Sequence, residues 1–308
     1  MSFSEVRKTV KRAGRVGGVG VHSGQSVQVT LSPSSQKTGI VFRRTDQGEA
    51  SVPADWRYVT STRYSTTIGI GAITVSTVEH LMAAFWALGI TDAYVDIDGP
   101  EVPILDGSSL PWMNCLMDLG LQVLEGFCDR LAPLQAVRVV DGHSWMEIHP
   151  SKALRVDMFV PLDNGALQAF SYIDGQTSFS DDVSCARTFS FKKHVQAMLD
   201  RGFIRGGSLD NALVIHDGHS INELGFRQPD ECARHKVLDF LGDWALCGKV
   251  FKGHVIGFAS GHGLNHALLR QVIQQTESVK QHQTRVTFSH APPGSCLPCA
   301  RLNCTHVQ

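Results

Sequence analysis

Short apolar runs alternate with turn residues through the first part of the chain. Residues 27–31 (VQVTL) alternate apolar and polar side chains, and a serine-containing loop separates them from a second apolar run at 39–42 (IVF preceded by glycine). This is the pattern of two strands joined by a loop. Similar runs predict three more strands, at residues 66–70, 72–75 and 93–97.

One segment of this half has a helical pattern with recognisable ends. Residues 76–89 place Ser76 where an N-cap is expected, Glu79 at the capping-box position and Gly89 where a helix can close. A second helix is predicted near residues 111–119. The first half therefore combines strands with helices.

The second half repeats this order. Strands are predicted at residues 137–140, 145–148, 154–160, 212–215 and 255–259, and helices at about 192–201 and 265–276. Between them, apolar side chains recur at the spacing of an amphipathic helix, at Val237, Leu238, Leu241, Ala245 and Leu246. Blocks of strands with intervening helices favour α+β layers over a regular parallel winding.

The pattern pauses at about residues 125–133, and we place a domain boundary there. The predicted fold class is α+β, with two similar domains, each a layered sandwich of sheet and helices. The N-terminal domain is predicted to span residues 1–127 and the C-terminal domain residues 134–285. Residues 286–308 form a cysteine-containing tail that we expect to be disordered.

Composition and charge exclude several classes of protein. The 308 residues are 43% hydrophobic and 19% charged, as in ordinary globular proteins. A net charge of −1 provides no global field for nucleic acid or an anionic membrane. The N-terminus lacks the apolar run of a secretory signal, and no uncharged apolar stretch is long enough to cross a bilayer. We expect a cytoplasmic monomer with no nucleic-acid partner and no stable membrane insertion.

The chain has eight cysteines. Without a secretory signal this number argues against a disulfide framework, and five of them have the pattern of small buried hydrophobes: Cys115, Cys128, Cys185, Cys232 and Cys247. The other three form a C-x2-C-x4-C-x-H cluster with His306 in the tail: Cys296, Cys299 and Cys304. That cluster could bind a structural zinc ion, but it follows a proline-rich segment and lacks a periodic apolar pattern, which favours a disordered tail.

The predicted helix around residue 235 holds the first candidate for chemistry. His235, Asp239 and Asp243 lie four residues apart, so their side chains form a row along one side of a helix. An imidazole and a carboxylate one turn apart can grip a divalent metal such as zinc, which takes both ligand types. The same row also suits a solvated helix face, so the metal hypothesis depends on a partner elsewhere in the chain.

Glu79 and His80 form a second candidate. A zinc hydrolase needs a metal ligand beside a carboxylate that can take a proton from water. The capping box explains Glu79 equally well, whereas a histidine at this position has no capping role. His80, His235 and Asp239 together provide three protein ligands and leave a fourth position open, as catalytic zinc sites require.

His262 is a third candidate. It lies between two glycines, on a loop predicted just after a strand. A flexible backbone of this kind can bring an imidazole close to a substrate. An ordinary surface histidine fits the same pattern.

Taken in order, these segments resemble one enzyme family. The matching motifs are GVGVHSG at 18–24, STVEHL at 76–81, EVPILDGS at 101–108, ARTF at 186–189, GGSLDNA at 206–212, RHKVLDFLGD at 234–243 and SGHGLN at 260–265. Their order and spacing resemble those of UDP-3-O-acyl-N-acetylglucosamine deacetylase, the zinc enzyme of lipid A synthesis. The resemblance runs from about Val6 to about Val272. It implies zinc-dependent hydrolysis of the N-acetyl group of an acylated UDP-amino sugar, with release of acetate.

The resemblance also implies where the metal and the base lie. His80, His235 and Asp239 match the zinc ligands of the family. Glu79 matches its general base. The active site is then expected in the cleft between the two domains.

Four other residues match supporting roles in the family. His262 matches the general acid, and Asp243 matches the carboxylate that orients this histidine. Thr188 matches the hydroxyl that stabilises the oxyanion, and Lys236 matches a cation that contacts the substrate. A carboxylate one turn beyond a metal ligand is well placed to hold an imidazolium.

An acylated substrate also needs an apolar channel. The segment 189–204 aligns with an insert that forms a hydrophobic passage in the family. Its candidate lining and substrate-contacting residues are Phe189, Phe191, Val195, Met198 and Ile204. The same apolar stripe is equally consistent with ordinary core packing.

Two segments depart from the family pattern. Residues 161–165 read PLDNG where many members have a DFxHP run, and His143 and Ser144 stand where a lysine is often found. Both differences concern the nucleotide end of the substrate. A zinc deacetylase of another N-acetylated sugar, or a non-catalytic nucleotide-sugar-binding relative, stays open as an alternative, although a binding protein needs neither Glu79 nor His262.

Overall fold

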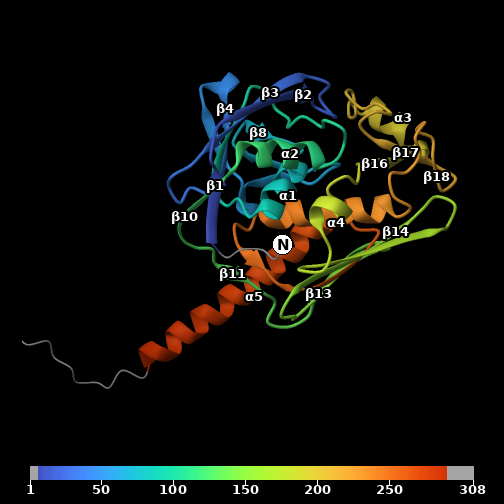
Figure 1. Ribbon diagram of the computed structural model, residues 1–308. Helices are drawn as coiled ribbons and strands as arrows, with labels where there is room; N and C mark the ends of the chain where they lie inside the picture. Colours follow the sequence, from blue (N-terminus) through green and yellow to red (C-terminus); the bar gives the residue numbers. More distant parts are fainter. Residues whose placement is uncertain (1–5, 290–308) are drawn as a thin grey trace, which may run out of the picture.

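The computed structural model describes residues 6–289, and the side chains of residues 6–278. Two five-stranded sheets, one from each half of the chain, lie on opposite sides of a layer of helices (Figure 1). The fold is α+β with two similar halves, as the sequence predicts.

The N-terminal sheet has the order β2 (Gly14–Val19), β3 (Ser26–Pro33), β9 (Ala93–Ile97), β4 (Ile40–Arg44) and β5 (Ala50–Pro53). Neighbouring strands are antiparallel except for β4 and β9, which are parallel. Phe42 lies opposite Val95 in the parallel pair, and both side chains are fully buried. Buried positions alternate with more exposed ones along β3 and with half-buried ones along β4, which leaves one face of this sheet against the helices.

The C-terminal sheet has the same topology. Its order is β12 (Val137–Asp141), β13 (Ser144–His149), β20 (Gly253–Phe258), β14 (Leu154–Pro161) and β15 (Leu167–Ile173). Only β14 and β20 are parallel, and Val156 lies opposite Val255 with both side chains buried. The order and the strand directions match those of the N-terminal sheet position by position, which agrees with the predicted pair of similar domains.

The helices between the sheets bring the two halves into contact. α1 (Glu79–Leu88) and α2 (Leu110–Leu119) come from the first half, and α4 (Glu231–Ala245) and α5 (His262–Ser289) from the second. α1 packs against α2 and α4, and both α4 and α5 pack on the C-terminal sheet. At Gly242 an added Cβ would lie 2.0 Å from the carbonyl oxygen of Glu79, so only glycine allows α4 to approach α1 this closely.

Smaller elements complete each half. One three-stranded sheet contains β6 (Val59–Ser61), β7 (Thr67–Ile70) and β8 (Ile73–Val75), and another contains β16 (Phe189–Phe191), β17 (Leu213–His216) and β18 (His219–Ser220), with α3 (Lys192–Asp200) after β16. Two more pairs are β1 (Val6–Val10) with β10 (Leu121–Phe127) and β11 (Arg130–Leu131) with β19 (Val250–Phe251). Short helical turns are η1 (Thr45–Gln47), η2 (Trp56–Tyr58) and η3 (Phe179–Val183).

One large hydrophobic cluster extends through both halves. Trp86 of α1 stacks on Phe251 of β19, with ring centroids 5.9 Å apart. Phe240 and Trp244 of α4 pack 4.9 Å apart, and both are fully buried. Because this core is shared, apolar burial itself holds α1 against α4.

The first helix begins later than predicted, at Glu79. Its N-cap is Val78, without a side-chain hydrogen bond, so the prediction of Ser76 as N-cap and of a capping box was wrong. Ser76 instead forms a parallel bridge with Glu101, which keeps this residue extended. Gly89 ends the helix as predicted, with φ of 68°.

The prediction that His262 lies on a loop was also wrong, because it is the first residue of α5. The carbonyl of Gly261 accepts a hydrogen bond from the Asn265 N–H at 3.0 Å, as an N-cap residue does, and glycine is tolerated at that position. The helix continues past Thr276 to Ser289. The polar sequence after Thr276 leaves no apolar periodicity from which this extension could be read.

Residues 121–127, which overlap the start of the predicted pause, form the strand β10. Almost all of its side chains are exposed, so no buried face gives this strand a pattern that could be recognised in the sequence. Its partner is β1 at the other end of the same half, as Figure 1 shows at the left of the molecule. The domain limits at residues 127 and 134 stay predictions.

The five cysteines predicted to be buried are free thiols, but only Cys232 and Cys247 are fully buried, and the other three are half-buried. Cys296, Cys299, Cys304 and His306 of the tail lie outside the described residues. Among the helices that are described, none combines the length and the apolar character needed to span a bilayer.

Candidate active site

Three of the predicted residues meet where α1 contacts α4. His80 comes from α1 and His235 and Asp239 from α4, and one potential ligand atom of each lies within 4.8 Å of the others. Asp239 Oδ1 is 3.2 Å from His235 Nε2 and 3.8 Å from His80 Nε2. All three side chains are buried. The structure therefore brings the predicted triad together from both halves of the chain.

The donor atoms of this triad suit a divalent cation. Asp239 Oδ1 and His80 Nδ1 are buried, and neither has a hydrogen-bond partner among the described residues. His235 Nδ1–H donates to the carbonyl of Ala186 at 3.0 Å, which leaves the lone pair of Nε2 facing Asp239. Burial and the neighbouring His235 lower the pKa of His80 to about 3, so its imidazole is neutral at physiological pH. Two imidazoles and one carboxylate are a usual donor set for such a metal.

Asp239 is held in its charged form. Burial opposes ionisation, but His235 and Lys236 beside it hold the pKa of this carboxyl well below its usual range. Lys236 Nζ donates to Asp239 Oδ2 at 2.8 Å and lies 5.2 Å from the centroid of the Phe189 ring. The second carboxylate oxygen is therefore occupied by Lys236, and Oδ1 is left for a cation.

A carboxylate–imidazole pair lies directly beside the triad. Glu79 Oε1 is 3.6 Å from His262 Nε2, and His262 Nδ1–H donates to Asp243 Oδ2 at 2.8 Å. Burial opposes the charged imidazole, but the Asp243 and Glu79 carboxylates raise the pKa of His262 to about 10. Burial raises the pKa of Glu79 to about 8. A histidine held in its protonated form suits a proton donor, and a carboxylate with a raised pKa suits a proton acceptor.

Asp243 is positioned by residues that we did not predict from the sequence. Asn265 Nδ2 donates to Asp243 Oδ2 at 2.7 Å, and Thr66 Oγ1 donates to Asp243 Oδ1. His266 Nε2 lies 3.5 Å from the same Oδ1. The only sequence signal was that Asn265 and His266 follow His262 in one short motif.

Thr66 contacts both sides of the pair. Besides its bond to Asp243, its backbone N–H donates to Glu79 Oε2 at 3.0 Å. Thr66 precedes β7 and lies 13 residues from Glu79 and 177 from Asp243, neither of which is a spacing that a helix or strand would bring together. This contact also replaces the capping bond that the sequence suggested for Glu79.

Thr188 is fixed through its backbone. Its N–H donates to the Gly107 carbonyl at 2.7 Å, and its own carbonyl accepts from Leu213 N–H at 2.8 Å. It is half-buried and immediately precedes Phe189, whose ring lies edge-on to His235 with centroids 6.2 Å apart. Thr188 therefore lies one residue before a ring that contacts the triad.

The predicted channel residues lie at different depths. Phe189 and Phe191 meet edge-on at 6.1 Å and pack against a small buried cluster in the second half. These contacts partly fit the alternative interpretation of ordinary core packing. Met198 of α3 is buried, whereas Val195 and Ile204 are half-buried. Only Phe189 has a described contact with the triad.

The two departures from the family pattern lie at strand ends of the C-terminal sheet. His143 belongs to the turn between β12 and β13, where Ser144 begins β13. In the 161–165 segment, the Asp163 carboxylate accepts from the N–H groups of Asp217 and Gly218, at 3.0 and 2.7 Å. This run therefore holds the turn between β17 and β18.

Fold and site together define a class, an α+β protein of two similar halves in which a buried triad of two histidines and one aspartate lies beside a carboxylate–imidazole pair. The family model described as UDP-3-O-acyl N-acetylglycosamine deacetylase matches residues 7–274. The chain belongs to this family.

Curated relatives are similar over most of their length. A UDP-3-O-acyl-N-acetylglucosamine deacetylase of Acidithiobacillus ferrooxidans is 40% identical over 288 residues, covering 89% of this chain and 93% of the relative. The protein of the same name from Myxococcus xanthus is 40% identical, covering 87% and 86%. That of Haemophilus influenzae is 38% identical, covering 88% and 91%.

Proposed function

We propose that this protein is a zinc-dependent deacetylase that hydrolyses the N-acetyl group of UDP-3-O-acyl-N-acetylglucosamine and releases acetate, in lipid A biosynthesis. The observation that carries the proposal is the junction of α1 and α4, where the triad and the Glu79–His262 pair lie side by side. Membership of the deacetylase family and the names of its relatives support the same substrate.

His80, His235 and Asp239 would hold the zinc ion through His80 and His235 nitrogens and Asp239 Oδ1. When bound, zinc supplies a Lewis acid for the acetamide carbonyl and lowers the pKa of a water molecule to about 7. Lys236 keeps Asp239 ionised and oriented through its bond to Oδ2. The same lysine is the cation that we propose for substrate contact.

Glu79 is the proposed general base. It accepts the proton of the attacking water, and its raised pKa makes it a stronger base than an exposed glutamate. The backbone N–H of Thr66 fixes Oε2, so Oε1, which faces His262, is the oxygen left for this proton. Water is the nucleophile that cleaves the amide.

His262 is the proposed general acid. The amine of the sugar leaves only when it receives a proton, and a protonated His262 Nε2 on the side of Glu79 can donate it. Asp243 stabilises the imidazolium through its contact with Nδ1. Thr188 is the proposed hydroxyl donor to the oxyanion of the tetrahedral intermediate.

Phe189, Phe191, Val195, Met198 and Ile204 are the proposed apolar contacts of the acyl chain. Phe189 lies next to His235, so a passage that begins at this ring would lead directly away from the reacting centre. A cytoplasmic location and a monomeric state stay predictions.

A second candidate is deacetylation of another N-acetylated sugar. The segment 161–165 departs from the family pattern at the nucleotide end of the substrate. Its Asp163 carboxylate is bonded to the β17–β18 turn. A non-catalytic relative is disfavoured, because a binding protein has no need of the buried Glu79–His262 pair.

Acetate release from three compounds tests the substrate. We expect rapid release from UDP-3-O-acyl-N-acetylglucosamine, and slow release from UDP-N-acetylglucosamine, which lacks the acyl chain, and from free N-acetylglucosamine. Preference for either of the last two would contradict the proposed substrate and favour the second candidate.

A further inference from the structure

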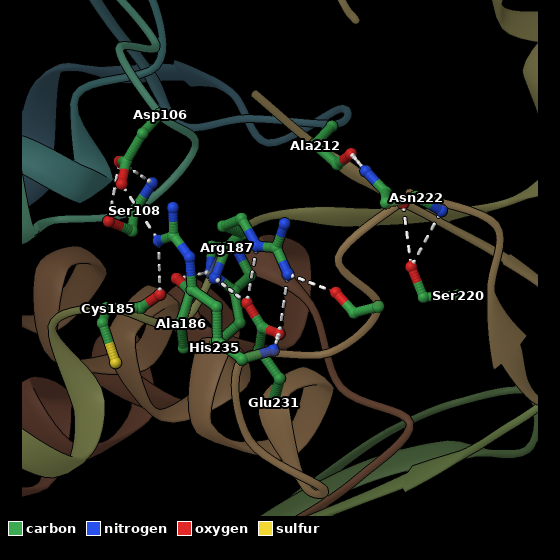
Figure 2. Close-up of polar contacts among 12 residues, drawn as sticks. Asp106, Ser108, Cys185, Ala186, Arg187, Ala212, Ser220, Asn222, Glu231 and His235 are labelled. Carbon is green, nitrogen blue, oxygen red and sulfur yellow. Dashed lines mark hydrogen bonds and ion pairs between the residues drawn. The ribbon is translucent and has the colours of Figure 1, made fainter. Parts of the chain in front are cut away.

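Glu231 is a fully buried carboxylate in the first turn of α4, one turn before His235. Figure 2 shows it enclosed by Arg187 and the loop before α4. Its Oε1 accepts from Arg187 N–H at 3.0 Å and Nε–H at 2.9 Å. Its Oε2 accepts from Arg187 Nη2 at 3.1 Å and from Arg227 N–H at 2.6 Å. Each oxygen of the Glu231 carboxylate thus accepts two hydrogen bonds.

Arg187 belongs to a short segment that lies against the metal triad. The carbonyl of Ala186, just before it, accepts the Nδ1–H of His235 at 3.0 Å (Figure 2). Thr188, just after it, is the proposed oxyanion donor, and Phe189 packs on the His235 ring. The path of residues 186–189 therefore sets both the hydrogen bond of a ligand and the position of two other site residues.

The same segment is tied to the first half of the chain. Ser109 N–H donates to the Ser184 carbonyl at 3.0 Å. Arg227 Nη1 donates to Asp106 Oδ2 and to the Cys185 carbonyl, both at 2.9 Å. Glu231 ties Arg187 of this segment to the first turn of α4, the helix that carries His235 and Asp239.

We propose that the Arg187–Glu231 ion pair is a positioning device for the metal centre. It fixes the Ala186 carbonyl, so that His235 keeps its proton on Nδ1 and presents the Nε2 lone pair beside Asp239. A hydrogen bond to the second nitrogen is what fixes the tautomer of a ligating histidine. The inference rests on the proposed metal site, and the pair acts on it through Ala186.

A second buried ion pair serves as a control, because it can show whether loss of any buried ion pair weakens the metal site or only loss of the Arg187–Glu231 pair does. Arg7 Nη2 lies 2.6 Å from Asp92 Oδ1, and both side chains are almost completely buried. Arg7 also donates to the carbonyls of Gln36 and Glu125, as Arg187 does to that of Gly225. The two networks are alike in chemistry, but Arg7 and Asp92 are tied to β1 and β10 and not to the triad.

The test compares Glu231→Gln with Asp92→Asn in the full-length protein. Zinc affinity is measured by competition with a chromophoric chelator, and unfolding by thermal melting. The tautomer of His235 is measured by NMR of the 15N-labelled, metal-free protein. We expect Glu231→Gln to weaken zinc binding by about 10- to 100-fold and to reduce the Nδ1–H form of His235. Asp92→Asn should lower the melting temperature without changing either property.

A double variant, Arg187→Met with Glu231→Leu, keeps the test open if Glu231→Gln does not fold, because apolar replacement of both partners of a buried pair often preserves folding. It should show the same loss of zinc affinity. Unchanged zinc affinity and tautomer in the folded variant would overturn the inference, as would an equal loss of affinity in Asp92→Asn. A wild-type protein that binds no zinc would overturn the proposed function instead.

Discussion

Thr66 donates one bond to each of the two carboxylates that flank His262, its N–H to Glu79 and its hydroxyl to Asp243. Hydrogen bonds to charged groups contribute about 1.5–3 kcal/mol each. Because the N–H bond belongs to the backbone, a side-chain substitution can remove the second bond while keeping the first. A substitution of Thr66 can therefore change how Asp243 orients His262, the proposed acid, while the bond to Glu79 is kept.

We predict that Thr66→Val, which keeps the shape and loses the hydroxyl, lowers kcat about tenfold or more, since about 1.4 kcal/mol corresponds to a factor of ten. Thr66→Ser keeps the hydroxyl and should retain most of the activity. Steady-state kinetics of both variants, with zinc content checked, makes the comparison. Equal activity of the two would show that the Asp243 contact has no part in the reaction.

Glu79 and His262 are expected to carry the proton transfers. Glu79→Ala and His262→Ala should each lower kcat by about 10²- to 10⁴-fold, the usual contribution of a positioned acid or base. Zinc should still bind, because neither side chain belongs to the triad. The measurement is turnover at saturating substrate together with zinc content. Near-wild-type turnover in either variant would rule out the role assigned to that residue.

The raised pKa of His262, about 10, predicts a pH dependence of stability in the metal-free protein. An unperturbed histidine titrates at about 6.5, so the folded state binds the proton more tightly than the unfolded state. The resulting stabilisation is fully present below about pH 6.5 and is lost as the pH rises towards 10.

Asp243→Asn removes the nearest of the charges that raise this pKa. The pKa of His262 should fall in this variant. The variant should have a lower free energy of unfolding than the wild-type protein, and this difference should be largest below about pH 6.5 and shrink in alkaline solution. NMR titration of the imidazole and urea unfolding across this range give the two readouts. A deficit that grows with pH would have the wrong sign for this account.

The sequence permitted a good part of the site to be predicted, and the reason lies in particular residues. His235 and Asp239 are one helical turn apart, so their pairing is a local property of α4. His80 became a candidate partner because a histidine at its position has no capping role, and the order of several motifs supported the choice, since α1 and α4 lie far apart in the chain. Thr66 and the Ala186 carbonyl were missed, since a backbone N–H or carbonyl that becomes a partner only through tertiary contact leaves no residue pattern.

At the scale of elements, the crossing of α1 and α4 decides the shape of the site. Gly242 lies between the proposed ligand Asp239 and the end of α4, and its Cα faces the Glu79 carbonyl of α1. Since Glu79 precedes the proposed ligand His80, the distance between the helices sets how far His80 lies from His235 and Asp239.

We predict that Gly242→Ala lowers the free energy of unfolding by about 1–3 kcal/mol, as overpacking of a tight interior does, and weakens zinc binding. The new Cβ would meet a backbone oxygen at 2.0 Å, so the helices must move apart. Gly17→Ala is a suitable control, because there the nearest atoms belong to the flexible Gln28 side chain. Urea unfolding and chelator competition compare the two. A Gly242→Ala protein with unchanged zinc affinity would contradict this view of the crossing.

Elements were predictable where one face of them is buried. Most strands of the two large sheets and α4 alternate or repeat in a regular way and appear where expected, but β2, β5 and β15 were not predicted. β10 escaped prediction because its side chains are nearly all exposed and only its pairing with β1 makes it a strand. The start of α1 was misplaced because Ser76, a good capping residue, is held extended by Glu101.

On the scale of the whole molecule, two sheets of equal topology enclose helices that meet at one junction. One half supplies His80 and Glu79, and the other supplies His235, Asp239, Asp243 and His262. The site is therefore complete only when both halves are folded against each other. The order of strands and helices indicated two similar halves, but the identical strand order was not readable from the sequence, because it depends on the non-local pairing of β9 and β20.

The central claim is that one zinc ion held by His80, His235 and Asp239 makes this protein a deacetylase. Its most direct test is acetate release from UDP-3-O-acyl-N-acetylglucosamine by chelator-treated protein to which zinc is returned stepwise. We predict no release without metal and a rise that ends at one equivalent per chain, with no restoration in Asp239→Ala at the same zinc concentrations. Full activity after complete metal removal, or equal restoration in Asp239→Ala, would contradict the account.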